Sequence, residues 1–142
     1  HLLAETVTGN VLDMGCGTGV LAILAEKLGA SKVFGIDNDQ WAVDNSKENC
    51  NLNNSEKTTI ELGNSETIGE RKFDLILANI NRNVLMNDLP LYANALATSG
   101  ILFLSGFYEK DFEALKNSAA KLGLFFVNQE VKNEWGILKF SK

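Results

Sequence analysis

The sequence is poor in the residues that mark disulfide frameworks, metal sites and membrane spans. Its 142 residues include one proline, one histidine and two cysteines, Cys16 and Cys50, whose contexts suggest neither a disulfide nor a metal-ligand cluster. No apolar run approaches the roughly 20 residues that a bilayer-spanning helix needs. No signal-peptide pattern opens the chain. We therefore expect reduced thiols, no metal, no membrane association and a cytoplasmic location.

Positive charge is also scarce. The chain has 13 Lys and Arg against 18 Asp and Glu, which gives a net charge of −5. A domain that binds RNA or DNA alone usually carries a basic stripe, whereas Arg71, Lys72 and Arg82 form only small clusters that we expect to be ordinary solvated charges. This charge balance predicts no direct nucleic-acid binding. An acidic surface favours a basic protein partner over a phosphate backbone. The length favours one domain over residues 1–142.

Glycine, by contrast, is concentrated near the start of the chain. Residues 13–19 read DMGCGTG, after the apolar pair Val11 and Leu12 and before an amphipathic segment. That order predicts a strand, a glycine loop and a helix. Glycines at every second position allow a sharp turn and close approach to a ligand. The helix N-terminus offers free backbone N–H groups to an anionic or carboxylate-bearing ligand.

An acidic residue follows at the spacing expected for a nucleotide-like ligand. A second strand ends at Asp37, 20 residues beyond Gly17, where a carboxylate can accept hydrogen bonds from ribose hydroxyls. A nicotinamide fingerprint requires glycine at the first, third and sixth positions. Counted from Gly15, the sixth position is Val20. The sequence therefore does not favour a nicotinamide dehydrogenase. The alternative to a ligand-binding loop is a glycine-rich turn that binds no ligand.

The remaining chain alternates between strand and helix patterns. We expect an N-cap at Asp39, a helical segment beginning at Pro90 and ending before Gly100, and a helix after residue 111 that stops at Gly123. Residues 2–6 resemble the end of a helix, and His1 receives no role. The other expected elements are strands at 10–14, 32–36, 58–62, 73–78, 101–104, 124–131 and 135–140, and helices at 18–28 and from Asp39 through Cys50. Alternation predicts a parallel sheet covered on both faces, and the short turn at residues 132–134 makes the last pair antiparallel.

The loop and the closing hairpin together resemble the S-adenosylmethionine-dependent methyltransferases with a Rossmann-like fold. The resemblance implies S-adenosyl-L-methionine as cofactor and a seven-stranded, mostly parallel sheet with helices on both faces. It also assigns roles to residues. Asp13 would lie near the ammonium group, Asp37 would hold the ribose, and Gly15, Cys16, Gly17, Thr18 and Gly19 would form the loop under the methionine part.

Polar residues follow the later strands, at the edge where ligands of open α/β sheets bind. Asn79 comes directly after an apolar strand, and its side-chain amide can accept a hydrogen bond from an incoming amine and orient its lone pair. We therefore take Asn79 as the candidate catalytic residue. The alternative is that Asn79 caps the next helix. For Asn81 we prefer a capping or solvent-exposed position over a catalytic role. Related enzymes that methylate planar nitrogens carry Pro-Pro after this residue, whereas Ile80 and Asn81 follow here.

Three segments together resemble one family, the methyltransferases of large-subunit ribosomal protein L-eleven (PrmA). They are residues 75–80 (LILANI), 104–106 (LSG) and 134–135 (EW). This resemblance implies methylation of lysines and an N-terminal amine on that ribosomal protein, and a cofactor site that includes Asn64 and Asn79. It also implies a missing N-terminal recognition domain, so we expect a catalytic-domain fragment.

Two positions depart from the family pattern. Asn64 stands where an adenine-contacting Asp is usual, and the polar Asn38 follows Asp37 where an apolar contact is common. For Trp41 we prefer packing of its helix against the sheet over stacking on the adenine. Two other readings stay open: a methyltransferase of the same fold that acts on another protein or a small amine, and a non-catalytic cofactor-binding module.

Overall fold

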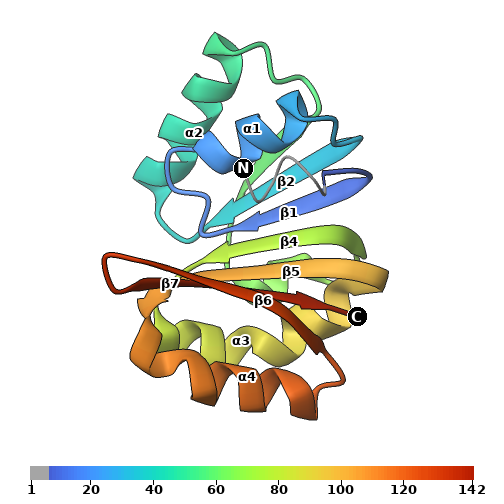
Figure 1. The fold of residues 1–142 in the computed structure, drawn as a ribbon. Coiled ribbons are helices and arrows are strands. Elements are labelled where there is room, and N and C mark those ends of the chain that lie inside the picture. The colour runs from blue at the N-terminus through green and yellow to red at the C-terminus, as the bar shows by residue number, and fades with distance from the viewer. Residues whose placement is uncertain (1–6) are drawn as a thin grey trace.

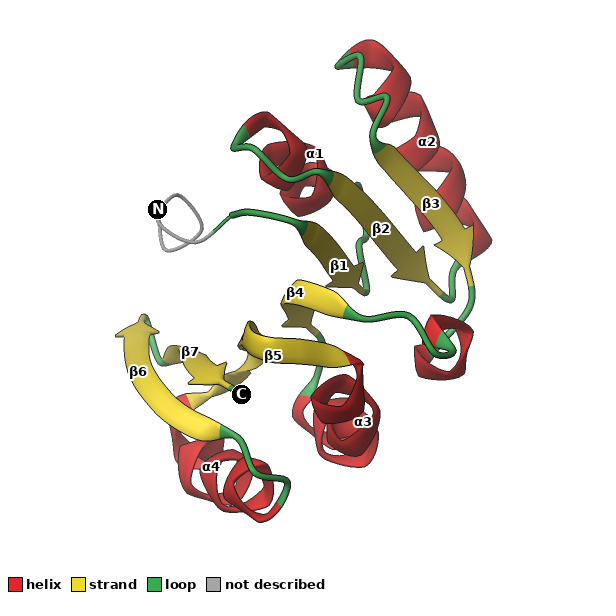
Figure 2. Cartoon of the chain, turned by 90° about the vertical axis from the view of Figure 1, so that its right-hand side faces the viewer, coloured by secondary structure: helices red, strands yellow, loops and turns green. Residues whose placement is uncertain are grey.

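The computed structural model describes residues 7–142, so the helix end expected at residues 2–6 lies outside the described residues. One seven-stranded sheet runs through the molecule with helices on both sides (Figures 1 and 2). The elements are β1 (Asn10–Met14), α1 (Val20–Lys27), β2 (Lys32–Asp37), α2 (Gln40–Leu52), β3 (Thr58–Leu62), the 3₁₀ turn η1 (Ser65–Ile68), β4 (Phe73–Asn79), α3 (Arg82–Ala95), β5 (Leu96–Tyr108), η2 (Glu109–Asp111), α4 (Phe112–Lys121), β6 (Phe125–Lys132) and β7 (Trp135–Ser141).

The strand order is β3-β2-β1-β4-β5-β7-β6. The first five strands in this order are parallel, and β7 is antiparallel to both β5 and β6. The expected sheet, mostly parallel with an antiparallel closing hairpin, is confirmed. The chain runs outward from β1 to β3 and then crosses to β4 on the other side of β1. The carboxyl ends of β1 and β4 therefore flank the switch point where ligands of such sheets bind.

Both faces of the sheet are buried, which explains the continuous apolar run in β4. Successive side chains of a strand point to opposite faces. Leu75 and Leu77 pack in the cluster that includes α1, whereas Ile76 and Ala78 pack in the larger cluster that includes α3 and α4. Asp74, the exception in this run, is exposed and accepts a hydrogen bond from the Asn10 N–H at 2.9 Å.

The segment around Pro90 differs from the prediction. Pro90 was expected to begin a helix, but it lies inside α3, which begins at Arg82 with Asn81 as N-cap. Leu85, Leu89 and Tyr92 are fully buried along this helix. Burial of that apolar face outweighs the hydrogen bond that a proline cannot donate. Gly100 also does not end the helix, because the chain enters β5 directly at Leu96.

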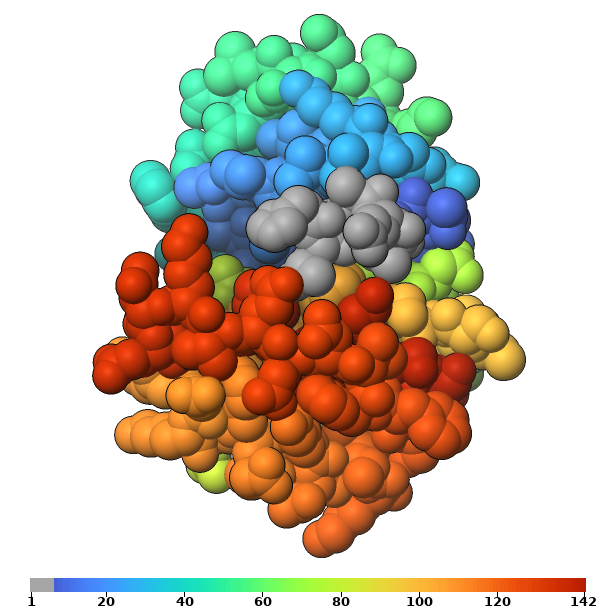
Figure 3. Space-filling model, in the orientation of Figure 1, coloured from blue at the N-terminus to red at the C-terminus, as the bar shows by residue number. Residues whose placement is uncertain are grey.

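Several strands extend beyond their expected ends. β2 and β4 include Asp37 and Asn79, which places both side chains on strand termini rather than in mobile loops. The β6–β7 turn contains Asn133 and Glu134 at φ of 52° and 71°, the left-handed pair that a two-residue hairpin requires. The hairpin (red in Figure 3) lies at the surface, and every residue of β6 is exposed. None of the helices described in residues 7–142 is long and apolar enough to cross a membrane.

Candidate active site

The glycine loop connects the end of β1 to α1. Gly15, Gly17 and Gly19 have φ of 70°, 57° and 84°, values that side-chain-bearing residues rarely adopt. The backbone N–H groups of Gly15 and Cys16 both donate to the carbonyl of Ile36, at 2.8 and 3.1 Å. The loop therefore folds back onto the end of β2 and fixes its distance from Asp37.

Two side chains of α2 hold the carbonyls of this loop. The Ser46 hydroxyl donates to the Gly17 carbonyl at 2.6 Å, and the Asn49 amide donates to the Thr18 carbonyl at 2.8 Å. A Cβ at Gly19 would lie 3.2 Å from the Ser46 Cβ, whereas one at Gly17 would meet nothing within 4 Å. The loop is thus fixed from one side and leaves open space at Gly17.

Sequence reasoning missed both of these residues. Ser46 is fully buried on the helix face that also carries Val43 and Cys50. A polar residue that interrupts an apolar helical stripe usually has a specific hydrogen-bond partner, and that was the available signal. Cys50 itself packs in a small core with Cys16, Val43 and Ile60.

Cys16 turns its side chain into that core. Its Sγ lies 3.7 Å from the Ser46 Oγ, and burial raises the pKa of the thiol to about 11. The thiol is therefore neutral at physiological pH. Only the backbone of Cys16 is left to contact a ligand at the loop.

Asp37 connects the loop to the start of α2. Its Oδ2 accepts the Gly17 N–H at 2.9 Å, and its Oδ1 accepts the Asp39 N–H at 3.0 Å. A carboxylate has about four acceptor positions, so two remain available. Asp39 is the N-cap of α2, as predicted, and accepts the Trp41 N–H at 3.0 Å.

Trp41 does not pack its helix against the sheet. Its side chain is 69% exposed, and the prediction of a packing role is wrong. The buried residues of α2 are Ala42, Val43, Ser46 and Cys50. Trp41 occupies the helix position just before this stripe and points away from it.

Asp13 is buried beneath the loop. It is 1% exposed, and neither carboxylate oxygen has a hydrogen-bond partner among the described residues. Burial raises the pKa of Asp13 to about 7; the nearby backbone N–H of Ala22 partly offsets this rise, and the Asp37 carboxylate adds a smaller one. A buried acid without a partner is destabilising in its ionised form. A positive charge close to Asp13 would favour its ionised form.

One cleft of about 340 Å³ lies at the carboxyl ends of β1, β2 and β4. Of the predicted cofactor residues, its walls include Gly15, Asp37, Asn38, Asn64 and Asn79. Asp13 and the loop residues 16–19 lie next to these walls rather than in them. The fold therefore gathers into one cleft residues that are spread over 64 positions of sequence, from 15 to 79.

Asn64 is the N-cap of η1. Its Oδ1 accepts the Glu66 N–H at 2.9 Å, and its own N–H donates to the Thr67 hydroxyl at 3.1 Å. These reciprocal bonds fix the Asn64 backbone and its amide together. A carbonyl oxygen has two lone pairs, so the amide can still accept from a ligand.

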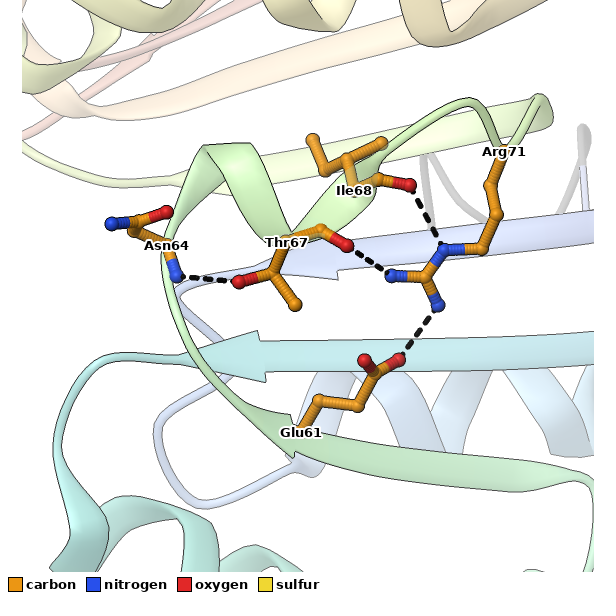
Figure 4. A network of polar contacts seen from close by, with 5 residues as sticks. All are labelled: Glu61, Asn64, Thr67, Ile68 and Arg71. Atoms are coloured by element: carbon orange, nitrogen blue, oxygen red, sulfur yellow. Dashed lines mark hydrogen bonds and ion pairs between the residues drawn. The ribbon is translucent and has the colours of Figure 1, made fainter.

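Arg71 anchors the turn that carries Asn64 (Figure 4). Its Nη2 and Nε donate to the carbonyls of Thr67 and Ile68 at 2.7 and 3.0 Å, and its Nη1 donates to Glu61 on β3 at 2.7 Å. The guanidinium also lies over the Phe34 ring, 4.8 Å from its centroid. The expectation that Arg71 is an ordinary solvated charge is wrong. Its planar fork joins η1 to β3 and β2.

We predict that Arg71→Met lowers the free energy of unfolding by about 1–3 kcal/mol, because it removes three hydrogen bonds from charged donors. Arg71→Lys is expected to recover part of this loss, since an ammonium can keep the Glu61 pair but cannot reproduce the planar fork. Denaturant unfolding measures both. Arg82→Met is the control, because the exposed Arg82 makes only a 3.2 Å hydrogen bond to its neighbour Asn83 and a 3.7 Å pair with Asp111 among the described residues. Equal losses in Arg71→Met and Arg82→Met would contradict the anchoring role.

Asn79 ends β4 beside a glycine of β5. Residues 79–81 are called the Asn79 corner below. Asn79 pairs in register with Ser105, and its side chain is exposed. A Cβ at Gly106, where φ is 95°, would lie 2.7 Å from the Ile80 carbonyl oxygen and 3.0 Å from the Asn79 Oδ1. Gly106 thus permits close packing of β5 against this corner.

Asn81, and not Asn79, caps the following helix. The Asn81 Oδ1 accepts the Val84 N–H at 3.1 Å. The capping interpretation is confirmed for Asn81 and wrong for Asn79. Within residues 7–142 the Asn79 side chain makes no hydrogen bond that would compete with a ligand. Its amide is therefore available at the edge of the cleft.

Comparison with known proteins decides the family. Residues 2–142 match the family described as ribosomal protein L11 methyltransferase (PrmA). This chain belongs to that family. Among curated proteins, the ribosomal protein L11 methyltransferase of Phocaeicola vulgatus is 48% identical over 99% of this chain and 50% of its own length. The protein of the same name from Porphyromonas gingivalis is 46% identical over 99% of this chain and 49% of its own length. The chain thus spans about half the length of these relatives.

A solved structure confirms the fold class. The ribosomal protein L11 methylase from Lactobacillus delbrueckii subsp. bulgaricus superposes with a TM-score of 0.92 at 28% identity, over 99% of this chain and 75% of that chain. The PrmA-family chain therefore has the class I methyltransferase fold. The segments 75–80, 104–106 and 134–135, which indicated the family, lie at β4, β5 and the closing hairpin.

Proposed function

We propose that this chain is the S-adenosylmethionine-dependent catalytic part of a protein methyltransferase that modifies lysines and other amino groups of a large-subunit ribosomal protein. The observation that carries the proposal is the single cleft that holds Gly15, Asp37, Asn64 and Asn79 together. Membership of the PrmA family and the names of its relatives support the ribosomal substrate. Such a substrate would place the protein in the cytoplasm.

The residues in and beside the cleft fit S-adenosylmethionine part by part. The unpartnered Asp13 carboxylate suits the ammonium group, and the open space at Gly17 suits the methionine chain. The two remaining acceptor positions of Asp37 suit the ribose hydroxyls. Asn64, fixed by η1, suits the adenine amino group. The acceptor positions of Asp37 and Asn64 are thus matched to polar groups of the cofactor.

When bound, S-adenosylmethionine supplies an electrophilic methyl group. Asn79 is placed to accept a hydrogen bond from an amine N–H, which orients the nitrogen lone pair toward the cleft. A lysine must arrive neutral, and its desolvation on entering the site lowers the pKa of its ammonium group. We assign Asn79 this positioning of the acceptor. The role needs no proton transfer to the protein.

We also propose that residues 1–142 are one catalytic domain and that the full protein adds a substrate-recognition domain. The relatives, which are about twice as long as this chain, support this proposal. Cofactor binding would then belong to the domain described here. Efficient recognition of the ribosomal protein would require both domains.

The first experiment is a calorimetric titration of this chain with S-adenosylhomocysteine, with NADH as the control ligand. We expect saturable binding of the first and none of the second. Binding of NADH alone would overturn the methyltransferase proposal. Methyl transfer by the two-domain protein is then measured with the ribosomal protein and with a small amine as alternative acceptors. Transfer to the amine alone would overturn the proposed substrate and leave the chemistry standing.

A further inference from the structure

A second cavity, of about 620 Å³, lies on the other side of the Asn79 corner. It is bounded by the closing hairpin, and it shares Asn79, Ile80 and Asn81 with the cofactor cleft. These three residues therefore border both cavities. In Figure 1 the hairpin turn lies on the side to which the arrowheads of β1 and β2 point, which is the ligand-binding edge of the sheet.

The strand register places an acid on the same face as Asn79. Asn79 pairs with Ser105, Ser105 with Ile137, and Ile137 with Glu130. Paired residues of neighbouring strands point to the same face of a sheet, so these four side chains form one row across β4, β5, β7 and β6. With strands about 4.8 Å apart, Glu130 lies about 14 Å from Asn79.

The walls between these two ends include apolar side chains. Ile80, Trp135 and Ile137 all line the cavity. Trp135 is 50% exposed, but its ring stacks on Tyr108 with centroids 4.5 Å apart and planes at 25°. The stack holds a flat apolar surface in place at the cavity wall. Such a surface suits the methylene stem of a lysine, which packs on apolar groups while its charged end stays in contact with polar ones.

The distance to Glu130 exceeds the reach of that stem. A lysine side chain extends about 6 Å from its Cα, as five bonds of about 1.5 Å in a zigzag. Each further residue of an extended peptide adds at most about 3.6 Å. A lysine whose amine lies at Asn79 would thus bring a neighbouring residue of its own peptide, and not its amine, to Glu130.

We propose that the second cavity binds an extended peptide segment with the acceptor lysine at the Asn79 corner, and that Glu130 selects a positively charged residue next to that lysine. The inference rests on the proposed function, because it takes the cofactor to occupy the adjoining cleft. The net charge of −5 is consistent with a basic segment. Lys132 also lines the cavity, and its positive charge opposes the effect of Glu130 on a basic peptide. The two residues should therefore change peptide binding in opposite directions.

The test uses this chain saturated with S-adenosylhomocysteine and titrated with two peptides. Both carry one central lysine, flanked by arginine in one peptide and by glutamine in the other. We expect the arginine peptide to bind about three- to fivefold more tightly, the range of an exposed ion pair. Glu130→Gln is expected to abolish this preference, and Lys132→Gln to increase it.

Glu134→Gln is the matched control, because it makes the same charge change in the hairpin turn. Glu134 lines a separate depression with Tyr108 and not the second cavity. The Glu134→Gln variant should prefer the arginine peptide over the glutamine peptide as strongly as the unmodified chain does. A preference that survives Glu130→Gln, or that Glu134→Gln abolishes equally, would overturn the inference. The inference would also be overturned if the chain bound S-adenosylhomocysteine but neither peptide. If the chain did not bind S-adenosylhomocysteine, that result would instead count against the proposed function.

Discussion

Replacing Asp37 with alanine is expected to weaken the binding of S-adenosylhomocysteine by about 30- to 100-fold. Asp37 uses two acceptor positions for the N–H groups of Gly17 and Asp39, and we propose that the other two accept from the ribose. Hydrogen bonds to a charged acceptor contribute about 1.5–3 kcal/mol, and the substitution also releases the glycine loop. Calorimetric titration at one pH and one salt concentration measures the change.

Two further variants separate these effects. Ser46→Ala loosens the loop from the α2 side without removing a ligand contact, so its loss of affinity should be several-fold smaller. Asp39→Ala removes the N-cap of α2 and should lower stability by about 1 kcal/mol while affinity stays within twofold. If Asp37→Ala bound the ligand as tightly as the unmodified chain, the assignment of the ribose to Asp37 would be wrong.

The sheet could be predicted because its strands carry strong local signals. Residues 10–14, 58–62 and 73–78 are apolar or β-branched runs between turn residues, and each became a strand within one residue of its expected bounds. The error at Pro90 has the opposite origin. Proline is a strong local signal for a helix start, but burial of Leu85 and Tyr92 along one face of α3 stabilises a helix that continues through it.

The residues that line the candidate cleft could be predicted where the position in the chain alone decides where a side chain lies. Asp37 and Asn79 are the last residues of β2 and β4, and the chain direction alone places them at the carboxyl edge of the sheet. Ser46 and Arg71 act instead through contacts with backbone carbonyls of other segments. Such contacts depend on how α2 and η1 pack, which one sequence does not reveal. Trp41 shows the same limit, because an aromatic residue on a helix is usually buried and this one is not.

Asp13 should make the free chain less stable as the pH rises. Its pKa is raised from the ordinary 3.8 to about 7, chiefly by burial, so between these values the folded chain binds a proton that the unfolded chain has lost. The free energy of unfolding should therefore fall by about 1.4 kcal/mol per pH unit from about pH 4 to pH 7, about 4 kcal/mol in all. In Asp13→Asn this contribution should be absent. Urea unfolding at a series of pH values measures the difference in slope between the two proteins.

The same carboxyl group should make cofactor binding depend on pH in the opposite direction. In the proposed site the ammonium group of the ligand pairs with an ionised Asp13, so below pH 7 the chain would release a proton when it binds. Affinity for S-adenosylhomocysteine should then fall roughly 20-fold from pH 7.5 to pH 5.5. Asp13→Asn should bind about 10- to 100-fold more weakly at pH 7.5 and show no such dependence. A variant with the same pH dependence as the unmodified chain would show that another group titrates. A variant that loses the dependence would show that Asp13 is ionised for binding at a cost to the stability of the free protein.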